Sequence, residues 1–538
     1  MAQRIIRDGN EIAIDRSTDV VERNHFDLSN SYAYSCNFGA LVPACIMEVL
    51  PNSDYHLNTE AIVRFQPMIA PPMHNFRVHS EWFFVPNRLL WPNWEQFISP
   101  SVEGSAAPAM PYFNGINVTA NSLADYLRMP IISNTGGTNL SALPFAAYQR
   151  IVWDWYTDEN FTSMDMNNVP TLVDGNNTAQ FISTWGALGY RLFDADYFTS
   201  NLPWPQKSPT IIIPAFHGPL PVTDSASASS SKFSNVGGSN IPAGSTTTNQ
   251  STMAAGGAVS TILVNGVSVR VSANGQYEVS QANMTALAGT IEELRRAELL
   301  QEFFEADARG GTRYIETLWQ HFRSKSSDAR LQRAEYIGRT VQPIAISEVL
   351  NTTGTATAAQ GTMAGHGIAV TQHETGMSYH AEEHGFIICM ASVVPASAYY
   401  QGMPKMYWRS SRFDYAWPSL ATLGEQPTYN GELYYTGGST DTQTFGYLPR
   451  YTEYRMIPNT VGGDFKTSLD YWHDCRKFAS LPALNQAFVS VRSTNVDDNN
   501  LLRIFAVTDP TVQHILCHWY HSIKAVLPLP VVARPAFG

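Results

Sequence analysis

The sequence predicts a mainly β protein, an antiparallel sandwich elaborated by long loops. Short runs of branched and aromatic residues, each ending at a turn former, recur along the chain and are typical of strands. Clear helical periodicity appears in only two segments, and proline and glycine interrupt much of the rest. Strands separated by long loops, with isolated helices inside those loops, are typical of an elaborated antiparallel sandwich.

Five segments are predicted as strands. They are VHSEWFFVP (78–86), GFIICMASVVP (385–395), AFVSVRS (487–493), LLRIFAV (501–507) and HILCHWYHSIKAVLPLP (514–530). In the last and longest segment, odd-numbered residues 515–523 share one face and even-numbered residues 516–522 share the other. Because both faces carry apolar or aromatic side chains, we expect both to be mostly buried.

Two segments are predicted as helices. In TIEELRRAELLQEFFEADARGG (290–311), Thr290 and Glu293 form a capping box and the Gly310-Gly311 pair supplies the stop. Its apolar residues recur near helical spacing. In LPFAAYQRIVWDWY (143–156), aromatic and branched residues make an apolar stripe, which predicts a second helix.

Residues 225–290 differ from the rest of the chain in composition. Serine, threonine, glycine, alanine and asparagine dominate there, as in a flexible linker. Within this segment, TILVNGVSVRVSANGQYEVS (261–280) alternates β-branched residues around two turn pairs, Asn265-Gly266 and Asn274-Gly275, which is a strong hairpin signal. We predict a β-rich surface insertion at 225–290, carried by a discontinuous core made of residues 1–224 and 291–538.

Charge and aromatic content favour a protein that assembles with itself. Charged residues make up 15% of the chain, against about 25% in a typical soluble protein. The chain nevertheless contains 12 Trp, 25 Tyr and 26 Phe. Charge is depleted at the centre of protein interfaces, so burial against other copies accounts for this balance. The net charge of −12 and the mixed charges of residues 1–23 argue against nucleic-acid binding by a basic arm.

The sequence predicts a soluble protein made in a reducing cytoplasm. Its five cysteines lie far apart without a C-x-x-C pair, so neither a disulfide framework nor a structural zinc site is expected. The N-terminal residues MAQRIIRD lack the apolar core of a signal peptide. The longest apolar run, residues 385–398, is too short for a helix that spans a bilayer, so no membrane span is expected.

The stretch HAEEHGFIIC (380–389) contains the spacing of an inverted zinc-protease motif, H-x-x-E-H, formed by His380, Glu383 and His384. A zinc site of this kind needs both imidazoles on one helical face. The glycine and branched residues that follow favour a strand, in which residues four apart are separated by about 13 Å. We therefore interpret the stretch as a polar lead-in to a core strand and predict no metal site.

No catalytic or cofactor-binding residue is predicted. The sequence contains no G-x-S-x-G elbow, P-loop or G-x-G-x-x-G fingerprint. The acidic pairs Asp194/Asp196 and Asp497/Asp498 have the residue types of a glycosidase couple, but acidic residues beside Asn and Gly are more often turn formers. We expect neither enzyme activity nor a cofactor.

The segment KMYWRSSRFDYAW (405–417) interleaves cations with aromatic rings. The candidates for contact with single-stranded DNA are Lys405, Tyr407, Trp408, Arg409 and Arg412. In single-stranded nucleic-acid sites, bases stack on aromatic rings and phosphates pair with cations. Ordinary aromatic burial, with the cation stems lying along apolar surface, explains the same pattern and is the more common arrangement.

Eight stretches occur in an order that matches one family of viral proteins. They are NHFDLS (24–29), DYFTSNLPWPQK (196–207), ARGGTRYIE (308–316), DARLQRAEYIG (328–338), EHGFII (383–388), RFDYAWPSLATLGEQ (412–426), FGYLPRYTEYR (445–455) and FASLPALN (478–485). Together they resemble the major capsid protein of the Microviridae, small tailless bacteriophages with single-stranded DNA, and most closely that of the gokushovirus group. Residues 225–290 fall where gokushovirus capsid proteins carry a variable insertion.

The resemblance implies an eight-stranded antiparallel jelly roll of the viral capsid type, with large loop and helix insertions. It implies sixty copies in a T = 1 icosahedral shell around circular single-stranded DNA. Residues 225–290 would protrude at the threefold axes and serve in host attachment. The virion would be assembled in the cytoplasm of the host bacterium, with a bacterial surface receptor and a pilot or minor virion protein as further partners.

Neutralising DNA inside such a shell needs cations that this chain does not supply. Each copy carries a net charge of −12, which adds to the negative charge of the DNA phosphates. The resemblance implies a small basic DNA-associated protein as a partner, which fits the missing basic arm. We expect the purified chain alone not to condense DNA in moderate salt.

The alternative function is that of a secreted β-sandwich carbohydrate-binding protein or glycoside hydrolase. The many Trp, Tyr and acidic residues suit that class of protein. Such a protein is expected to carry a secretion signal and to stay small, whereas a capsid protein forms particles in the megadalton range. Size-exclusion chromatography therefore separates the two functions.

Overall fold

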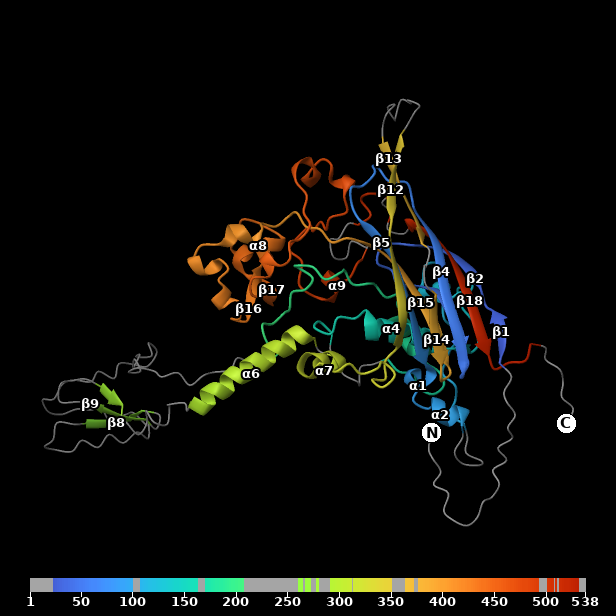
Figure 1. The fold of residues 1–538 in the computed structure, drawn as a ribbon, viewed down its shortest axis with the longest axis horizontal. Coiled ribbons are helices and arrows are strands. Elements are labelled where there is room, and N and C mark those ends of the chain that lie inside the picture. The colour runs from blue at the N-terminus through green and yellow to red at the C-terminus, as the bar shows by residue number, and fades with distance from the viewer. Residues whose placement is uncertain are drawn as a thin grey trace, which may run out of the picture. The chain divides into compact units, whose positions relative to one another are not determined.

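The fold is that of a computed structural model of the chain. It describes residues 23–99, 107–162, 170–207, 260–264, 267–271, 277–279, 291–311, 313–350, 363–371, 376–492, 501–507, 509 and 512–531. The chain divides into two compact units (Figure 1), residues 1–205 with 310–538 and residues 206–309.

The first unit contains an antiparallel sandwich of two sheets. Among the described residues, the larger sheet has seven strands in the order β1-β18-β4-β13-β12, with β2 also paired to β18 and β14 to β4. These strands are β1 (Asn24–Asp27), β2 (Asn30–Cys36), β4 (Ser53–Phe65), β12 (Ala345–Leu350), β13 (Met363–Thr371), β14 (Met377–Ala381) and β18 (Ile515–Leu527). Strands from both ends of the chain thus meet in one sheet.

The second sheet has four strands in the order β11-β5-β15-β3. They are β3 (Val42–Val49), β5 (Phe76–Pro86), β11 (Glu335–Pro343) and β15 (Gly385–Pro395). One hydrophobic core joins the two sheets, with Phe65 and Trp519 contributed by the larger sheet and Trp82 by the smaller. Within this core, the Phe505 ring packs against those of Phe38 and Phe65.

The outer face of the four-stranded sheet is covered by helices and loops. A second core cluster joins Phe83 and Ile388 of that sheet to Tyr148 and Ile151 of α4 (Leu143–Trp155). Short helices in the same region are α1 (Asn87–Leu90), α2 (Trp94–Ile98) and α3 (Leu123–Tyr126). The short strands β6 (Tyr112–Phe113) and β7 (Leu140–Ser141) pair with each other. Every residue of β15 is consequently buried.

Residues 396–492, between β15 and β18, form a third core cluster together with an earlier part of the chain; it contains Phe198, Leu433 and Phe488. Its regular elements are a β16–β17 hairpin (Glu425–Tyr429, Thr444–Pro449), α8 (Asn430–Leu433) and α9 (Gln486–Val489). Single 3₁₀ turns lie at Lys405–Trp408, Arg412–Asp414, Pro418–Leu420, Ser439–Thr442, Thr452–Tyr454, Gly463–Lys466 and Asp470–Trp472. Earlier in the chain, a 3₁₀ turn at Thr178–Gln180 precedes a π-helical turn at Phe181–Trp185.

The second unit contains a small antiparallel sheet and one long helix. The strands β8 (Ser260–Val264), β9 (Val267–Val271) and β10 (Tyr277–Val279) pair in the order β10-β9-β8. The helix α6 spans Ile291–Gly310, and the next helix, α7 (Tyr314–Phe322), belongs to the first unit. The predicted turn residues Asn265, Gly266, Asn274 and Gly275, and the predicted cap Thr290, lie outside the described residues.

Several sequence predictions are confirmed. The strand predicted at 385–395 is β15, the strands predicted at 78–86 and 514–530 correspond to β5 and β18, and the helix predicted at 143–156 is α4. The helix predicted at 290–311 is α6, and Gly311 follows it with φ of 99°, which only glycine adopts readily. The five cysteines are all free and buried.

Two predicted strands are wrong. Of these residues, 487–489 instead lie in α9, because the side chain of Asn485 accepts a hydrogen bond from the Phe488 N–H at 2.8 Å and starts a helical turn. In 501–507 the described residues make turns with Leu501 and Phe505 buried in the sandwich core. A short apolar run has the same composition in a strand and in a buried loop, so the pattern did not distinguish them.

The burial predicted for β18 is wrong on one face. Its odd-numbered residues are buried, but Leu516, His518 and Tyr520 are exposed on the outer face of the seven-stranded sheet. Neighbouring β4 alternates in the same way. In the part of the chain that the structure describes, no helix has both the length and the apolar character needed to cross a membrane.

Candidate assembly and nucleic-acid surfaces

The structure places Lys405, the first predicted DNA contact, in a salt bridge inside the protein. Its Nζ lies 2.8 Å from Glu432 Oε1 and donates a hydrogen bond to the Pro427 carbonyl at 2.9 Å. The ammonium group also lies 4.1 Å from the centre of the Tyr429 ring. Glu432 is 4% exposed and accepts a further hydrogen bond from the Tyr197 hydroxyl. Lys405 therefore neutralises a buried carboxylate.

Arg409 is held in the same way. Its guanidinium lies 3.5 Å from a carboxylate oxygen of Glu453 and donates a hydrogen bond to the Tyr454 hydroxyl. The guanidinium carbon also lies 5.0 Å from the centre of the Tyr415 ring and 4.7 Å from the centre of the Tyr454 ring. Only 10% of its side chain is exposed. Its charge is satisfied within the protein.

The other three predicted contacts differ from one another in exposure. Trp408 is half-buried and donates its indole N–H to the Met403 carbonyl at 2.9 Å. Tyr407 is 67% exposed, and Arg412 is exposed with its guanidinium 4.6 Å from the Phe413 ring centre. The structure thus leaves Tyr407 and Arg412 accessible to a partner, whereas Lys405 and Arg409 organise the loop.

These loop residues border a cleft of about 440 Å³. Its walls include Phe198, Tyr399, Lys405 and Arg409, and its rim includes Ile457, which is 85% exposed. The charges in the wall are balanced, since Lys405 and Arg409 pair with Glu432 and Glu453. The cleft therefore offers a neutral, largely apolar surface.

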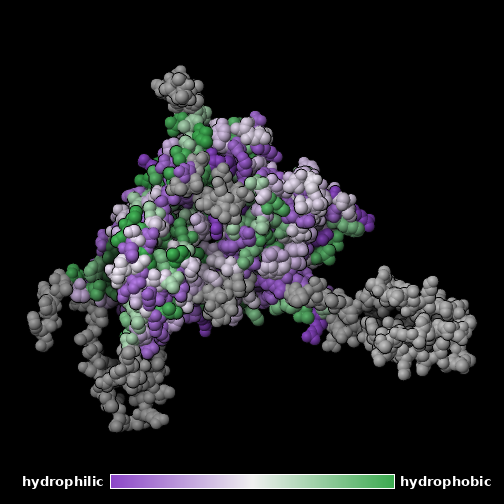
Figure 2. Space-filling view, turned by 180° about the vertical axis from the view of Figure 1, so that it is seen from behind, coloured by the Kyte–Doolittle hydropathy of each residue, from purple (hydrophilic) through white to green (hydrophobic). Residues whose placement is uncertain are grey.

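Exposed aromatic residues gather in two groups. The first lies on α7, where Tyr314, Trp319 and Phe322 are 67%, 53% and 74% exposed. The second belongs to residues 407–454 and contains Tyr407, Phe413, Tyr415, Trp417, Tyr435 and Tyr454. In Figure 2, hydrophobic residues form separate patches among hydrophilic ones on the face that is shown. Exposed apolar patches of this kind are typical of protein–protein contact surfaces.

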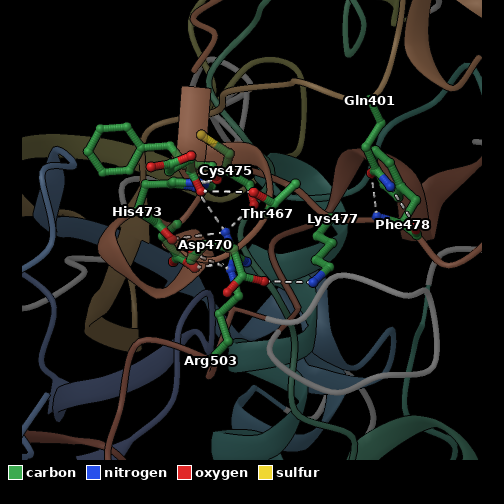
Figure 3. Close-up of polar contacts among 11 residues, drawn as sticks. Gln401, Thr467, Asp470, His473, Cys475, Lys477, Phe478 and Arg503 are labelled. Atoms are coloured by element: carbon green, nitrogen blue, oxygen red, sulfur yellow. Dashed lines mark hydrogen bonds and ion pairs between the residues drawn. The ribbon is translucent and has the colours of Figure 1, made fainter. Parts of the chain in front are cut away.

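A polar network fixes residues 470–477 to residues 501–507 (Figure 3). The Arg503 guanidinium donates hydrogen bonds to the carbonyls of Asp470, His473 and Cys475 at 3.0, 2.9 and 2.7 Å. The neighbouring Asp474 is fully buried, and this burial raises its pKa to about 7 although Arg503 lies 3.6 Å away. Arg503 thereby makes rigid a loop that has little secondary structure of its own.

A second pair of hydrogen bonds anchors the same loop region. The Gln401 amide donates to the Phe478 carbonyl at 2.8 Å and accepts from the Phe478 N–H at 2.7 Å (Figure 3). Lys477 also lies 2.7 Å from Asp470. Residues 396–492 are therefore held as a defined surface.

The H-x-x-E-H residues point to different partners. His380 lies on β14 with its Nδ1 2.6 Å from Asp54, whereas Glu383 forms a salt bridge of 2.6 Å with Arg88. The His384 ring packs 5.8 Å from that of Trp94. Among the described residues, no group of three or more His, Cys, Asp and Glu side chains is arranged to hold a metal ion.

Two features were not predicted from the sequence. They are the buried ion pairs that stabilise the fold and the polar outer face of the seven-stranded sheet. The buried carboxylate of Glu81 pairs with Arg191, which is distant in sequence, so no local pattern signalled it. The outer face had a signal, because β4 alternates polar and apolar residues from Ser53 to Phe65.

Comparison with known proteins identifies the family. The capsid protein (F protein) family matches residues 16–537. The chain is 31% identical to capsid protein VP1 of Bdellovibrio phage phiMH2K and 31% identical to capsid protein VP1 of Chlamydia phage 1, with 96% of both chains covered in each case. It is 30% identical to capsid protein VP1 of Spiroplasma virus 4, with 96% of this chain and 95% of that protein covered.

The family match decides between the two functions that the sequence left open. All three relatives are capsid proteins of Microviridae, so the chain is a structural protein and not a carbohydrate-active enzyme. Its antiparallel sandwich and its exposed aromatic groups suit a subunit that contacts its own copies. The chain belongs to the capsid protein (F protein) family and is a major capsid protein of a Microviridae-type bacteriophage, a component of the virion.

Proposed function

We propose that sixty copies of this chain close into a T = 1 icosahedral shell around a circular single-stranded DNA genome. The observation that carries the proposal is the membership of the capsid protein family over residues 16–537. The two exposed aromatic groups and the neutral cleft supply surface for contacts between copies. Closed symmetry leaves no such surface unpaired, which explains why the chain carries so much of it.

We propose that the sandwich is an eight-stranded jelly roll. Three observations support this topology. With β1 and β2 counted as one position and β13 and β14 as another, each sheet has four positions, which makes eight, and β12 adds an edge strand beside β13. The first and last positions, β2 and β18, pair with each other. All pairings within the two sheets are antiparallel, as two Greek keys require.

We propose that residues 225–290 form a surface protrusion at the threefold axes that attaches the virion to a bacterial surface receptor. The segment lies within the second compact unit, and its strands β8, β9 and β10 pair among themselves. Deleting 225–290 should leave assembly intact and abolish adsorption to host cells. Loss of folding in the deletion variant would show that the segment belongs to the core.

The remaining partners follow from the charge of the shell. A net charge of −12 for each copy makes a small basic DNA-associated protein the expected source of neutralising charge. A pilot or minor virion protein is the further partner that we propose, with assembly in the host cytoplasm. Of the five predicted DNA contacts, Tyr407 and Arg412 have the accessibility that such a contact needs. Lys405, Trp408 and Arg409 would support them from within the loop.

Assembly is tested by a substitution on α7. Phe322 is 74% exposed, so Phe322→Ser leaves the interior of the subunit unchanged and removes apolar surface from a predicted contact. We expect the variant to keep the circular dichroism spectrum of the parent chain and to elute as small species, while the parent forms megadalton particles. Phe322→Leu is the matched control, because it keeps an apolar side chain and should keep assembly. Equal assembly of all three chains would show that α7 is not a contact.

A further inference from the structure

The two sheets of the sandwich differ in what covers their outer faces. The outer face of the four-stranded sheet is packed against α4 and its neighbours, so that β15 is buried at every residue. In the seven-stranded sheet, β4 and β18 alternate between buried and accessible residues. Among the described residues, the outer face of the larger sheet is thus open to a partner.

Five histidines occupy outward positions on this open face, each on a different strand. They are His25 (β1), His56 (β4), His366 (β13), His380 (β14) and His518 (β18). The two neighbours of each along its strand lie towards the core side of the sheet, and those of His366 are the buried glycines Gly365 and Gly367. The chain contains 14 histidines, so more than a third of them share one surface.

The other charges on this face balance one another. The outward cations are Arg23, Arg64 and Lys524, and the outward carboxylates are Asp27, Asp54 and Glu60. Hydrogen bonds from Lys524 and Ser29 lower the pKa of Asp27 to about 2, and those from His380 and Arg23 lower the pKa of Asp54. Both carboxylates therefore stay ionised in mild acid. Any proton gained by the histidines then adds net positive charge to the face.

A hollow of about 550 Å³ lies on this face, lined by residues of β2, β4 and β18. Two rows of side chains cross it: Ala33, His518 and Ile62 are cross-strand partners in one row, and Leu516 and Arg64 are partners in the next. The small side chain of Ala33 leaves space beside His518. The hollow thus joins an apolar floor to one imidazole and one guanidinium.

We propose that the outer face of the seven-stranded sheet binds single-stranded DNA, with a base in the hollow and phosphates against Arg64 and the histidines. Bases stack on aromatic, histidine and apolar side chains, while phosphates pair with cations. A contact between copies would be depleted of charge at its centre, whereas this face is crossed by charged and ionisable groups. The inference rests on the proposed function, to which it adds the surface and its dependence on acidity.

The acid dependence follows from the chemistry of the side chains that carry the charge. Histidine is the side chain that ordinarily changes its charge between about pH 8 and about pH 5. Each added charge near a phosphate strengthens binding and steepens its dependence on salt. The face should therefore hold DNA weakly near neutral pH and more tightly in mild acid.

The test uses the full-length chain and fluorescently labelled oligothymidylate, with binding followed by fluorescence anisotropy. We expect affinity to rise about tenfold between about pH 7.5 and about pH 5.5 at constant salt. The triple variant His56→Gln, His366→Gln and His518→Gln should lose most of this rise, and Arg64→Ala should weaken binding at both pH values. His384 immediately precedes β15, away from this face, so His384→Gln is the matched control and should behave as the parent chain.

A second measurement locates the DNA in assembled particles. Ultraviolet cross-linking followed by mass spectrometry should yield thymidine adducts on peptides from β4 or β18. Particles that form normally but give adducts only elsewhere, or a triple variant with the parent's pH dependence, would overturn the inference and leave the proposed shell standing. Arg64→Glu particles that fail to form, with DNA binding unchanged, would assign the face to contacts between copies. Failure of the parent chain to form particles, with DNA binding as expected, would count against the proposed function alone.

Discussion

Arg191 and Glu81 form a bidentate ion pair on the helix-covered side of the four-stranded sheet, with nitrogen–oxygen distances of 2.9 and 3.0 Å. Tyr156, which follows α4, donates its hydroxyl to the same carboxylate. Burial raises the pKa of Glu81, but the hydrogen bonds and charge of Arg191 outweigh it and lower the pKa overall. The pair therefore links β5, the end of α4 and the loop at residue 191.

Removing Arg191 should destabilise the subunit strongly. With Glu81 only 6% exposed, Arg191→Ala leaves a buried carboxylate without its partner, which costs about 3–5 kcal/mol of the free energy of unfolding. Urea denaturation followed by tryptophan fluorescence measures this loss. Arg77→Ala is the control, because the Arg77–Asp194 pair is about half exposed at each side chain and is worth about 1 kcal/mol or less. Equal losses of unfolding free energy in the two variants would contradict the conclusion that the Arg191–Glu81 pair is buried and stabilises the fold.

Lys405 and Arg412 should separate structural from surface roles within one loop. Lys405→Ala leaves the buried Glu432 carboxylate without its charged partner and should cost about 2–4 kcal/mol of the free energy of unfolding. Arg412→Ala removes an exposed side chain and should change stability by about 0.5 kcal/mol or less. If Arg412 contacts DNA, its removal should also reduce the salt dependence of binding by about one phosphate contact. A stable Lys405→Ala variant with weakened DNA binding would reverse these roles.

Acid should weaken the fold through buried histidines. Burial, offset in part by a hydrogen bond to the Ala44 carbonyl, lowers the pKa of His521 to about 4, and burial together with the Arg191 charge lowers that of His79 to about 4. The unfolded chain takes up a proton near pH 6.5 and the folded chain only near pH 4. Stability is therefore complete above about pH 6.5 and is lost as the pH falls towards 4, by on the order of 3 kcal/mol for each histidine.

The variant His521→Gln tests whether His521 contributes to this loss of stability in acid. A glutamine can keep the contacts to Ala44 and Thr59 without titrating. Chemical denaturation at a series of pH values should show a smaller loss of stability between about pH 6.5 and about pH 4 in the variant. An unchanged slope would show that His521 is charged or accessible in the folded state.

Two glycines with nearly the same backbone conformation should respond differently to alanine. Gly39 and Gly437 have φ of 76° and 77°, so either substitution imposes the same left-handed strain, about 1 kcal/mol. A Cβ at Gly39 would lie 1.9 Å from the Val491 carbonyl oxygen, whereas nothing lies within 4 Å of one at Gly437. Gly39→Ala should abolish soluble expression, and Gly437→Ala should lower the melting temperature by only a few degrees. Similar yields of both variants would contradict the close approach.

The sequence predicted the elements whose pattern is local. The strand at 385–395 has a continuous run of apolar residues because both of its faces are buried. The sequence of α4 shows an apolar stripe because one face of the helix packs on the sheet. The outer face of β18 was misjudged because Leu516 and Tyr520 are apolar in type and yet exposed. The segments that cover a sheet face are far away in sequence. A local pattern therefore could not predict whether the outer face of β18 is buried.

The candidate site was predictable in composition and not in geometry. Cations and rings at 405–417 suggested DNA contacts, and the structure pairs Lys405 and Arg409 with Glu432 and Glu453, which lie 27 and 44 residues further along the chain. No spacing rule links residues so distant. The outward histidines were equally hidden, since each is a single residue on a separate strand and only the sheet order brings them to one face.

The most direct test of the account is electron cryomicroscopy of particles formed by the full-length chain. We expect closed icosahedral shells with sixty copies, in which exposed aromatic residues such as Phe322 and Tyr407 lie at contacts or against the genome. A chain that stays monomeric at every concentration, or shells in which those residues face bulk solvent, would contradict it.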